Sequence, residues 1–199
     1  MIDAIIFDIG NVLLRFDFGL AIQRIAPFCE APPARIPELL EPLKVDLESG
    51  HLAGAQFLKK TAADIGFTGE LTELRSAWQE IFEPIEATHR LVSHWKGKRP
   101  LYLLSNTNDI HAEYFLSKYP VFGLFEGAVF SHEAGVMKPA DAIYEHAVEK
   151  FGLNPSRTLF IDDLLPNINA AAALGWNVHH YNERDHESLI LRARELGLP

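Results

Sequence analysis

The sequence predicts an α/β protein: a Rossmann-like parallel sheet with helices on both faces, and a small all-helical cap inserted after the first strand. Two observations lead to this fold class. Short apolar runs alternate with helical patterns along much of the chain, which is typical of parallel strands joined by helical crossovers. The stretch 17–86 breaks that alternation, because it has several helical patterns and no clear strand.

The predicted strands are short runs with apolar residues on both faces, as expected for strands buried inside a parallel sheet. The first is the isoleucine-rich run at residues 2–7. Four more runs follow in the second half of the chain, at residues 101–104, 128–130, 158–161 and 178–181.

Helices are predicted where apolar residues recur at spacings of three and four. In the second half of the chain these segments are residues 109–118, 140–151, 166–174 and 185–196. Pro139 and Pro166 suit the first turns of two of these helices, whereas Gly152 and Gly175 suit helix ends.

The stretch between the first strand and the rest of the sheet has its own helical patterns, at residues 19–28, 35–48, 54–65 and 70–82. Asp17 suits the N-cap of the first of them. We therefore expect two domains. Residues 1–16 and 87–199 form the α/β core, and residues 17–86 form the helical cap.

The composition excludes several classes of protein. The 199 residues carry a formal net charge of −9, which is the wrong sign for a nonspecific nucleic-acid binder. No apolar stretch approaches the ~20 residues of a membrane-spanning helix. The single cysteine, Cys29, rules out an intramolecular disulfide. With no secretory leader visible, we expect a cytoplasmic protein.

Polar residues follow the predicted strands at the points where the strands end. Asp8 follows the first, the run 105–108 follows the second, Lys138 lies in the loop after the third, and Asp162 and Asp163 follow the fourth. Ligands of open parallel sheets bind beyond the carboxyl ends of the strands. We therefore expect these side chains to meet at one edge of the sheet.

The chemistry of this set suits phosphoryl transfer. A carboxylate such as Asp8 can act as a nucleophile, and Asp163 offers the hard oxygen ligand that Mg²⁺ prefers. Lys138 can balance the negative charge of carboxylates and phosphate. Ser105 and the backbone N–H of Asn106 can donate to phosphate oxygens. Such positioning and charge neutralisation supply most of the catalysis in phosphoryl transfer.

At these residues the sequence resembles the haloacid dehalogenase superfamily, in the branch of phosphatases with a cap. The likeness covers nearly the whole chain. Within the superfamily the sequence is most similar to small bacterial phosphatases that hydrolyse α-D-glucose 1-phosphate. Four segments carry the resemblance in the family's order: residues 7–13, 104–108, 135–139 and 161–163 with Asn167.

The resemblance implies roles for individual residues. Asp8 would be the nucleophile that forms an aspartyl-phosphate. Mg²⁺ would be held by Asp8, Asp163 and the main-chain carbonyl of Gly10, with Asp162 as the alternative to Asp163. Ser105, Asn106 and Lys138 would grip the phosphate, and Ser105 and Lys138 would belong to the catalytic set with Asp8.

The sequence departs from the family at Gly10. Most phosphatases of the superfamily have a second aspartate there, which protonates the leaving group and then activates water. General acid–base groups of this kind contribute typically ~10²–10⁴-fold in rate. Two hypotheses remain open: the substrate has a good leaving group such as an anomeric oxygen, or a cap residue takes over the proton transfer.

The sequence also leaves structural readings and other functions open. Asp8, Ser105 and the pair Asp162–Asp163 are residue types that also cap helices or start turns. The turn at residues 48–51 faces the active site by resemblance, or is a solvated helix connection. A metal-independent 2-haloacid dehalogenase and a non-catalytic binding protein of the same fold are the alternatives to a Mg²⁺-dependent phosphatase acting on a small phosphorylated metabolite.

Overall fold

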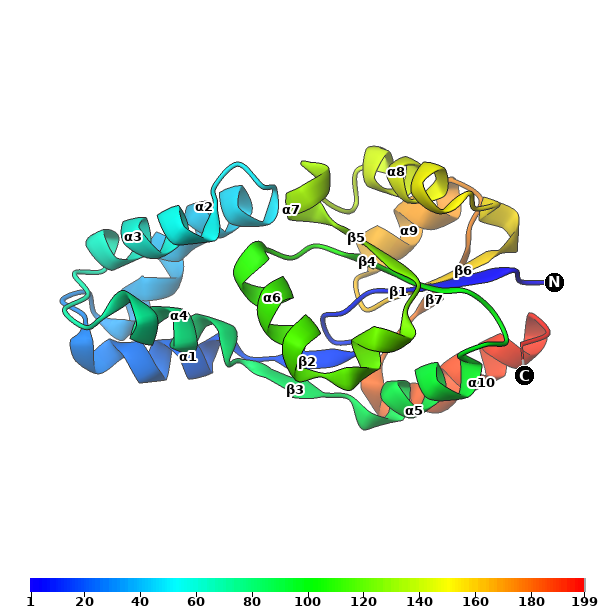
Figure 1. Ribbon diagram of the computed structural model, residues 1–199, viewed down its shortest axis with the longest axis horizontal. Coiled ribbons are helices and arrows are strands. Elements are labelled where there is room, and N and C mark those ends of the chain that lie inside the picture. The colour runs from blue at the N-terminus through cyan, green and yellow to red at the C-terminus, as the bar shows by residue number, and fades with distance from the viewer. Residues whose placement is uncertain (199) are drawn as a thin grey trace.

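The computed structural model describes residues 1–198, and its centre is one five-stranded parallel sheet (Figure 1). The spatial order is β5–β4–β1–β6–β7, and β1 pairs in parallel with β4 on one side and β6 on the other. The five strands are β1 (Ala4–Phe7), β4 (Leu101–Ser105), β5 (Gly127–Phe130), β6 (Thr158–Asp162) and β7 (Asn177–His180). All five predicted strands are present, and the predicted fold class is confirmed.

Helices cover both faces of this sheet (Figure 1). On one face lie α5 (Glu86–Trp95), α6 (Asp109–Lys118) and α10 (His186–Glu195), and on the other lie α8 (Asp141–Phe151) and α9 (Leu165–Ala173). Successive residues of β1 point alternately to the two faces. Ile5 and Phe7 therefore join the first hydrophobic cluster, and Ile6 joins the second.

A helical region that we call the cap lies beside the sheet, at the left of Figure 1. Its α-helices are α1 (Phe18–Ile25), α2 (Ile36–Glu48), α3 (Gly54–Asp64) and α4 (Leu71–Gln79). Asp17 caps α1, as predicted, by accepting a hydrogen bond from the backbone N–H of Gly19 at 2.7 Å. The cap packs around its own cluster, in which the Phe57 and Trp78 rings are 4.7 Å apart. The domain boundaries at residues 17 and 86 stay a prediction.

Two short strands join the cap to the core. β2 (Leu14–Phe16) and β3 (Phe82–Pro84) pair antiparallel, with Phe16 opposite Phe82. The expectation of no strand in residues 17–86 was therefore wrong for β3. A three-residue strand is too short to show periodicity, and its pairing partner is distant in sequence.

The prolines and glycines predicted at helix ends were tested by α8 and α9. Pro139 precedes α8, whose N-cap is Ala140, so the expectation that Pro139 occupies the first turn was wrong. Pro166 lies in the first turn of α9 and Gly152 caps the end of α8, both as predicted. The remaining short elements lie between these strands and helices. They are η1 (Ala26–Phe28), η2 (Pro33–Arg35), η3 (Pro120–Leu124), α7 (Ser131–Ala134), η4 (Pro155–Arg157) and η5 (Glu183–Asp185).

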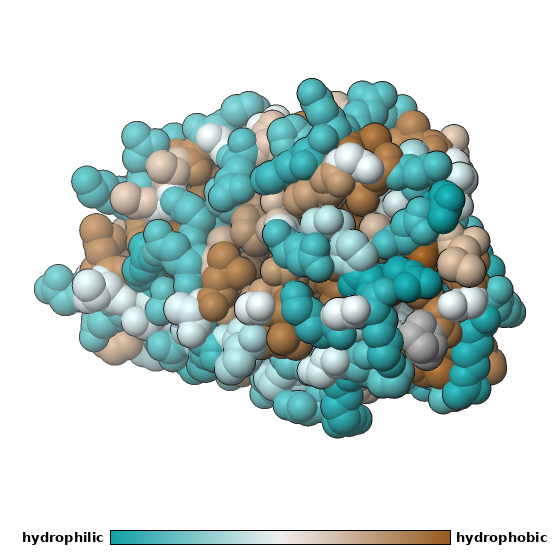
Figure 2. All heavy atoms as spheres, turned by 45° about the vertical axis from the view of Figure 1, so that its right-hand side comes forward, coloured by the Kyte–Doolittle hydropathy of each residue, from teal (hydrophilic) through white to brown (hydrophobic). Residues whose placement is uncertain are grey.

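The surface carries mostly hydrophilic side chains on the face that Figure 2 shows, and the apolar residues there form separate small patches. No helix within residues 1–198 has both the length and the apolar character needed to cross a bilayer.

Candidate active site

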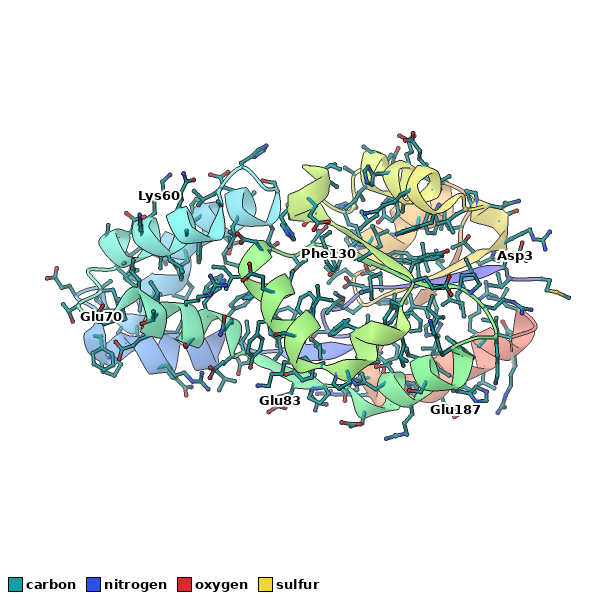
Figure 3. All side chains as sticks on the ribbon, viewed as in Figure 1. Asp3, Lys60, Glu70, Glu83, Phe130 and Glu187 are labelled. Carbon is teal, nitrogen blue, oxygen red and sulfur yellow. The ribbon has the colours of Figure 1, made fainter. Side chains whose placement is uncertain are left out.

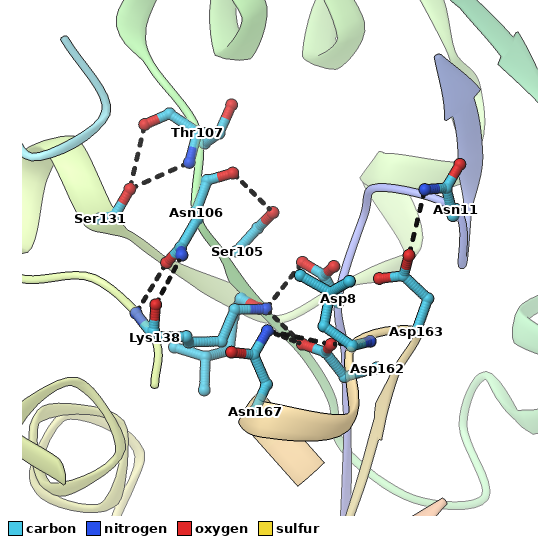
Figure 4. Close-up of polar contacts among 12 residues, drawn as sticks. Asp8, Asn11, Ser105, Asn106, Thr107, Ser131, Lys138, Asp162, Asp163 and Asn167 are labelled. Atoms are coloured by element: carbon cyan, nitrogen blue, oxygen red, sulfur yellow. Dashed lines mark hydrogen bonds and ion pairs between the residues drawn. The ribbon is translucent and has the colours of Figure 1, made fainter. Parts of the chain in front are cut away.

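The carboxyl ends of the three central strands bring the predicted polar residues together. Asp8 directly follows β1, Ser105 is the last residue of β4, and Asp162 is the last residue of β6. These are the strands where the chain changes from one side of the sheet to the other, which is the usual ligand position in such sheets. Lys138 reaches the same place from the loop after α7, as Figure 4 shows.

The ammonium group of Lys138 is the centre of this cluster. Its Nζ lies 2.9 Å from Asp8 Oδ1, 2.6 Å from Asp162 Oδ2 and 2.9 Å from the carbonyl oxygen of Leu104. The side chain is 1% exposed. The ammonium donates hydrogen bonds to Asp162 and to the Leu104 carbonyl, and it forms an ion pair with Asp8. Lys138 therefore acts first as the buried counter-ion of the two carboxylates.

The nucleophile candidate, Asp8, sits in a strongly perturbed environment. Burial raises the pKa of Asp8 to about 7, and the neighbouring Asp162 and Asp163 add to that rise, while Lys138 opposes it. Burial alone would lower the pKa of Lys138, but the carboxylates of Asp8 and Asp162 outweigh it and raise this pKa. Two buried carboxylates thus share one buried cation, and the cluster is short of positive charge.

The adjacent carboxylates Asp162 and Asp163 have different surroundings. Asp162 is fully buried, and it accepts hydrogen bonds from Lys138, from Asn167 Nδ2 and from the backbone N–H of Leu164. Asp163 is partly exposed and its carboxylate accepts one hydrogen bond, from Asn11 Nδ2 at 3.0 Å. Asp162 braces the loop, and Asp163 has oxygen lone pairs left for a ligand.

The site fits a hard divalent cation. Asp8, Asp162 and Asp163 each offer an oxygen, and the three oxygens lie within 4.8 Å of one another. Asp8 Oδ1 is buried and has no hydrogen-bond partner, since its approach to Lys138 is an ion pair without hydrogen-bond angles. Carboxylate oxygens are the ligands that Mg²⁺ takes, and a cation would supply the missing positive charge.

The loop after β4 is held by side-chain contacts to the loop that carries Lys138. The Asn106 amide pairs with the Lys138 backbone twice: Nδ2 donates to its carbonyl at 2.9 Å, and Oδ1 accepts from its N–H at 2.8 Å. The side chain of Asn106 thus positions Lys138. Ser105 is 3% exposed, and its hydroxyl makes one long contact, at 3.5 Å to the Asn106 carbonyl.

Two residues that hold the site were given no role from the sequence. Asn11 has a φ of 51°, in the left-handed region that asparagine tolerates, and its side chain orients Asp163. Ser131 directly follows β5, and its Oγ accepts from the Thr107 N–H at 2.9 Å and donates to the Thr107 carbonyl at 3.1 Å. The rule that polar residues after strands face the site would have found Ser131.

A small cavity of about 70 Å³ lies between this edge of the sheet and the cap. On the core side it is bounded by the loop after β4, including Ser105, and by Gly10. From the cap, Glu48 at the end of α2 reaches it. The other walls are mainly rings, from Phe16, Phe18, Phe82, His111 and Phe115. The turn at residues 48–51 therefore faces the site, through Glu48.

This fold and site define the class of protein: a Rossmann-like α/β core with a cluster of carboxylates at the carboxyl edge of its parallel sheet. The model of the haloacid dehalogenase-like hydrolases matches residues 2–175. The chain belongs to that family, and the predicted resemblance to the haloacid dehalogenase superfamily is confirmed.

The chain is also similar to curated phosphatases. It is 28% identical over 187 residues to the D-ribitol-5-phosphate phosphatase of Bacteroides thetaiotaomicron, covering 88% of this chain and 90% of that protein. It is 28% identical over 197 residues to a pyrimidine 5'-nucleotidase of Escherichia coli, covering 89% and 87%. These relatives agree with the predicted enzyme class, a phosphatase-type hydrolase.

Solved structures agree with the fold. A family enzyme from B. thetaiotaomicron, solved with magnesium and inorganic phosphate, superimposes with a TM-score of 0.85 at 26% identity, covering 96% of this chain and 99% of that one. An L-2-haloacid dehalogenase from Xanthobacter autotrophicus superimposes with a TM-score of 0.65 at 18% identity, covering 89% and 76%. The second likeness concerns the fold alone.

Proposed function

We propose that this protein is a Mg²⁺-dependent phosphatase that hydrolyses a small phosphorylated metabolite through an aspartyl-phosphate on Asp8. The observation that carries the proposal is the cluster of buried Asp8, Lys138 and Asp162 with partly exposed Asp163 at the carboxyl edge of the sheet. The reaction has two steps. An Asp8 oxygen bonds to phosphorus as the ester oxygen leaves, and water then displaces phosphate from Asp8.

Each residue of the site has a proposed part in this reaction. Lys138 keeps the Asp8 carboxylate oriented by the 2.9 Å ion pair and offsets its charge. The Ser105 hydroxyl and the Asn106 N–H donate to the phosphoryl oxygens, and the Asn106 side chain keeps Lys138 in place. Asp162 stays committed to Lys138 and Asn167.

Mg²⁺ would be held by Asp8, Asp163 and the Gly10 carbonyl. When bound, the cation neutralises charge on the phosphoryl group and on the carboxylates. Asp163 is proposed in preference to Asp162 because the oxygens of Asp162 already accept from three donors. The neighbouring enzyme that was solved with magnesium and phosphate supports this choice of cofactor.

The substrate is proposed from the shape of the cavity. A cavity of about 70 Å³ suits the leaving group of a small molecule better than a macromolecule. A hexose 1-phosphate is the first substrate to test. The curated relatives named for ribitol 5-phosphate and pyrimidine nucleotides widen the panel to pentitol phosphates and nucleoside monophosphates. We also propose that the protein acts in the cytoplasm. Its single cysteine, Cys29, is free, which fits that location.

The test is a screen of phosphorylated metabolites with released phosphate as the readout. We expect turnover that a chelator abolishes and added Mg²⁺ restores. Beryllium fluoride should bind the wild type as a phosphate mimic on Asp8, and it should not bind Asp8→Asn. Release of halide from 2-haloacids without metal would instead support the dehalogenase alternative. Absence of turnover and of beryllium fluoride binding would favour a non-catalytic protein.

A further inference from the structure

A side chain at the position two residues after Asp8 would contact the ring of Phe16. A Cβ built on Gly10 would lie 2.9 Å from Phe16 Cε1. The Phe16 ring, which packs against Phe18 and Phe82 with centroids 5.5 and 6.3 Å away, therefore occupies the space where a side chain at residue 10 would begin. Proton transfer to the leaving group must come from another residue or from none.

One carboxyl group lines the cavity, and it belongs to the cap. Among the described residues 1–198 that bound this cavity, Glu48 is the only acidic side chain. No hydrogen bond or ion pair within those residues occupies its carboxyl group. It is partly buried, and it shares the cavity with Gly10 and Ser105. A carboxyl group that makes no hydrogen bond or ion pair among the described residues and shares a cavity with the loop after β4 is available for a ligand.

The other titratable group in the cavity wall is already committed. Both ring nitrogens of His111 have partners, Asn108 Nδ2 and the Trp78 carbonyl, each at 3.0 Å. Burial lowers the pKa of His111 to about 4, so the ring is neutral near pH 7. His111 is therefore part of the wall and is no proton donor to a substrate.

The turn that follows Glu48 contacts the core directly. Gly50 has a φ of +77°, and a Cβ there would lie 2.2 Å from the carbonyl oxygen of His132 in α7. Four residues later, the Gly54 N–H donates to Asp109 Oδ2 at 2.9 Å. These two close approaches on either side of the turn hold the end of α2 against the core, and so hold Glu48 at the cavity.

We propose that Glu48 is the general acid and base of this enzyme, supplied by the cap in place of a side chain at Gly10. This inference rests on the phosphatase function proposed above. Burial raises the pKa of the Glu48 carboxyl, while Lys44 opposes the rise and Glu41 adds to it. The acid form is therefore more populated near neutral pH than for an ordinary glutamate, as proton donation requires.

The proton balance of the two steps is simple. As an Asp8 oxygen bonds to phosphorus and the bond to the ester oxygen breaks, the Glu48 carboxyl gives its proton to that oxygen, which leaves as an alcohol. In the second step the Glu48 carboxylate takes a proton from the attacking water. The new oxygen–phosphorus bond forms, the Asp8–phosphorus bond breaks, and both carboxyl groups return to their starting forms.

The test compares two leaving groups in Glu48→Gln, which cannot donate a carboxylic proton. On the alkyl phosphate that is hydrolysed best in the screen, kcat should fall by about 10²-fold or more. On p-nitrophenyl phosphate, whose leaving group departs without a proton, the first step should be nearly unchanged, measured as the burst of p-nitrophenolate. Glu48→Asp should recover part of the alkyl phosphate activity.

Matched controls separate this role from a structural one. Asp46→Asn removes an exposed carboxylate from the same helix and should leave both rates unchanged. In Glu48→Gln, a loss in the rate of the p-nitrophenolate burst as large as the loss in kcat on the alkyl phosphate, or no loss on either ester, would overturn the proposal. A wild type with no activity toward any phosphate ester would instead refute the proposed function, and the role of Glu48 with it.

Discussion

The edge of the sheet around Asp8 and the cavity beneath the cap are built in opposite ways. At the sheet edge, Lys138, Asp162 and Asn106 are buried or half-buried and saturated with contacts between 2.6 and 3.0 Å. In the cavity, Glu48 has no hydrogen-bond partner within residues 1–198, and rings form most of the wall. In the proposed reaction, the groups that act on every phosphate ester are held rigidly, and the side chains proposed to meet the leaving group are less restrained.

The largest difference between the two regions should appear in turnover. Asp8→Asn removes the proposed nucleophile, so we expect kcat to fall by about 10⁴-fold or more. Phe18→Leu changes the wall of the cavity and leaves the carboxylate cluster intact, and it should alter kcat/KM by about tenfold, mainly through KM. Steady-state kinetics on the best substrate measures both. A Phe18→Leu effect as large as that of Asp8→Asn would contradict the division of labour between the regions.

The next effect is on stability at the sheet edge. Lys138→Met leaves Asp8 and Asp162 buried without their counter-ion, which should lower the free energy of unfolding by about 3–5 kcal/mol. Urea denaturation at neutral pH measures it. Lys60→Met is the control, because Lys60 is exposed on the cap and points outward (Figure 3). A loss of the same size in the control would show that the buried cluster is not the cause.

The charge of Asp8 should also make stability depend on pH in metal-free protein. The pKa of Asp8 is raised from 3.8 to about 7 by burial, so between these values the folded protein binds a proton that the unfolded chain has released. The free energy of unfolding therefore falls as pH rises through this window. From the size of the shift, the contribution of Asp8 is on the order of a few kcal/mol.

Asp8→Asn removes this contribution. With chelator present, we expect the variant to gain stability over the wild type as the pH is raised from about 4 to about 8. Urea unfolding of both proteins across that range measures the difference, which isolates Asp8 from other titrating groups. A difference that stays constant with pH would contradict the prediction.

The smallest effect concerns the contact between the cap turn at Gly50 and the core. Gly50 and Gly97 both have a φ of +77°, but only Gly50 faces backbone, while nothing lies within 4 Å of a Cβ at Gly97. Alanine at either position should lower stability by about 1–2 kcal/mol through the left-handed backbone. Gly50→Ala alone should also move the turn away from His132 and lower kcat about tenfold or more. Equal kcat values in the two variants would show that this contact does not position the catalytic groups.

Much of the core could be predicted from the sequence because its signals are local. Apolar runs such as residues 101–104 and 158–161 mark buried strands by themselves, and the polar residues that end them follow directly. The shape of the sheet then brings Asp8, Lys138 and Asp163 together without further information. Asp17 could be assigned as the N-cap of helix α1 for the same reason, since the backbone N–H that it binds is two residues away.

The sequence by itself determined the succession of core strands and helices along the chain. It also determined the edge of the sheet at which the polar residues meet and the family of the chain. The tertiary structure alone decided that Asp162 is braced while Asp163 stays open, that the Phe16 ring fills the space beside Gly10, and that the turn after Glu48 rests on His132. Those outcomes depend on which distant side chains compete for the same volume and the same hydrogen-bond donors, and no local pattern records that competition.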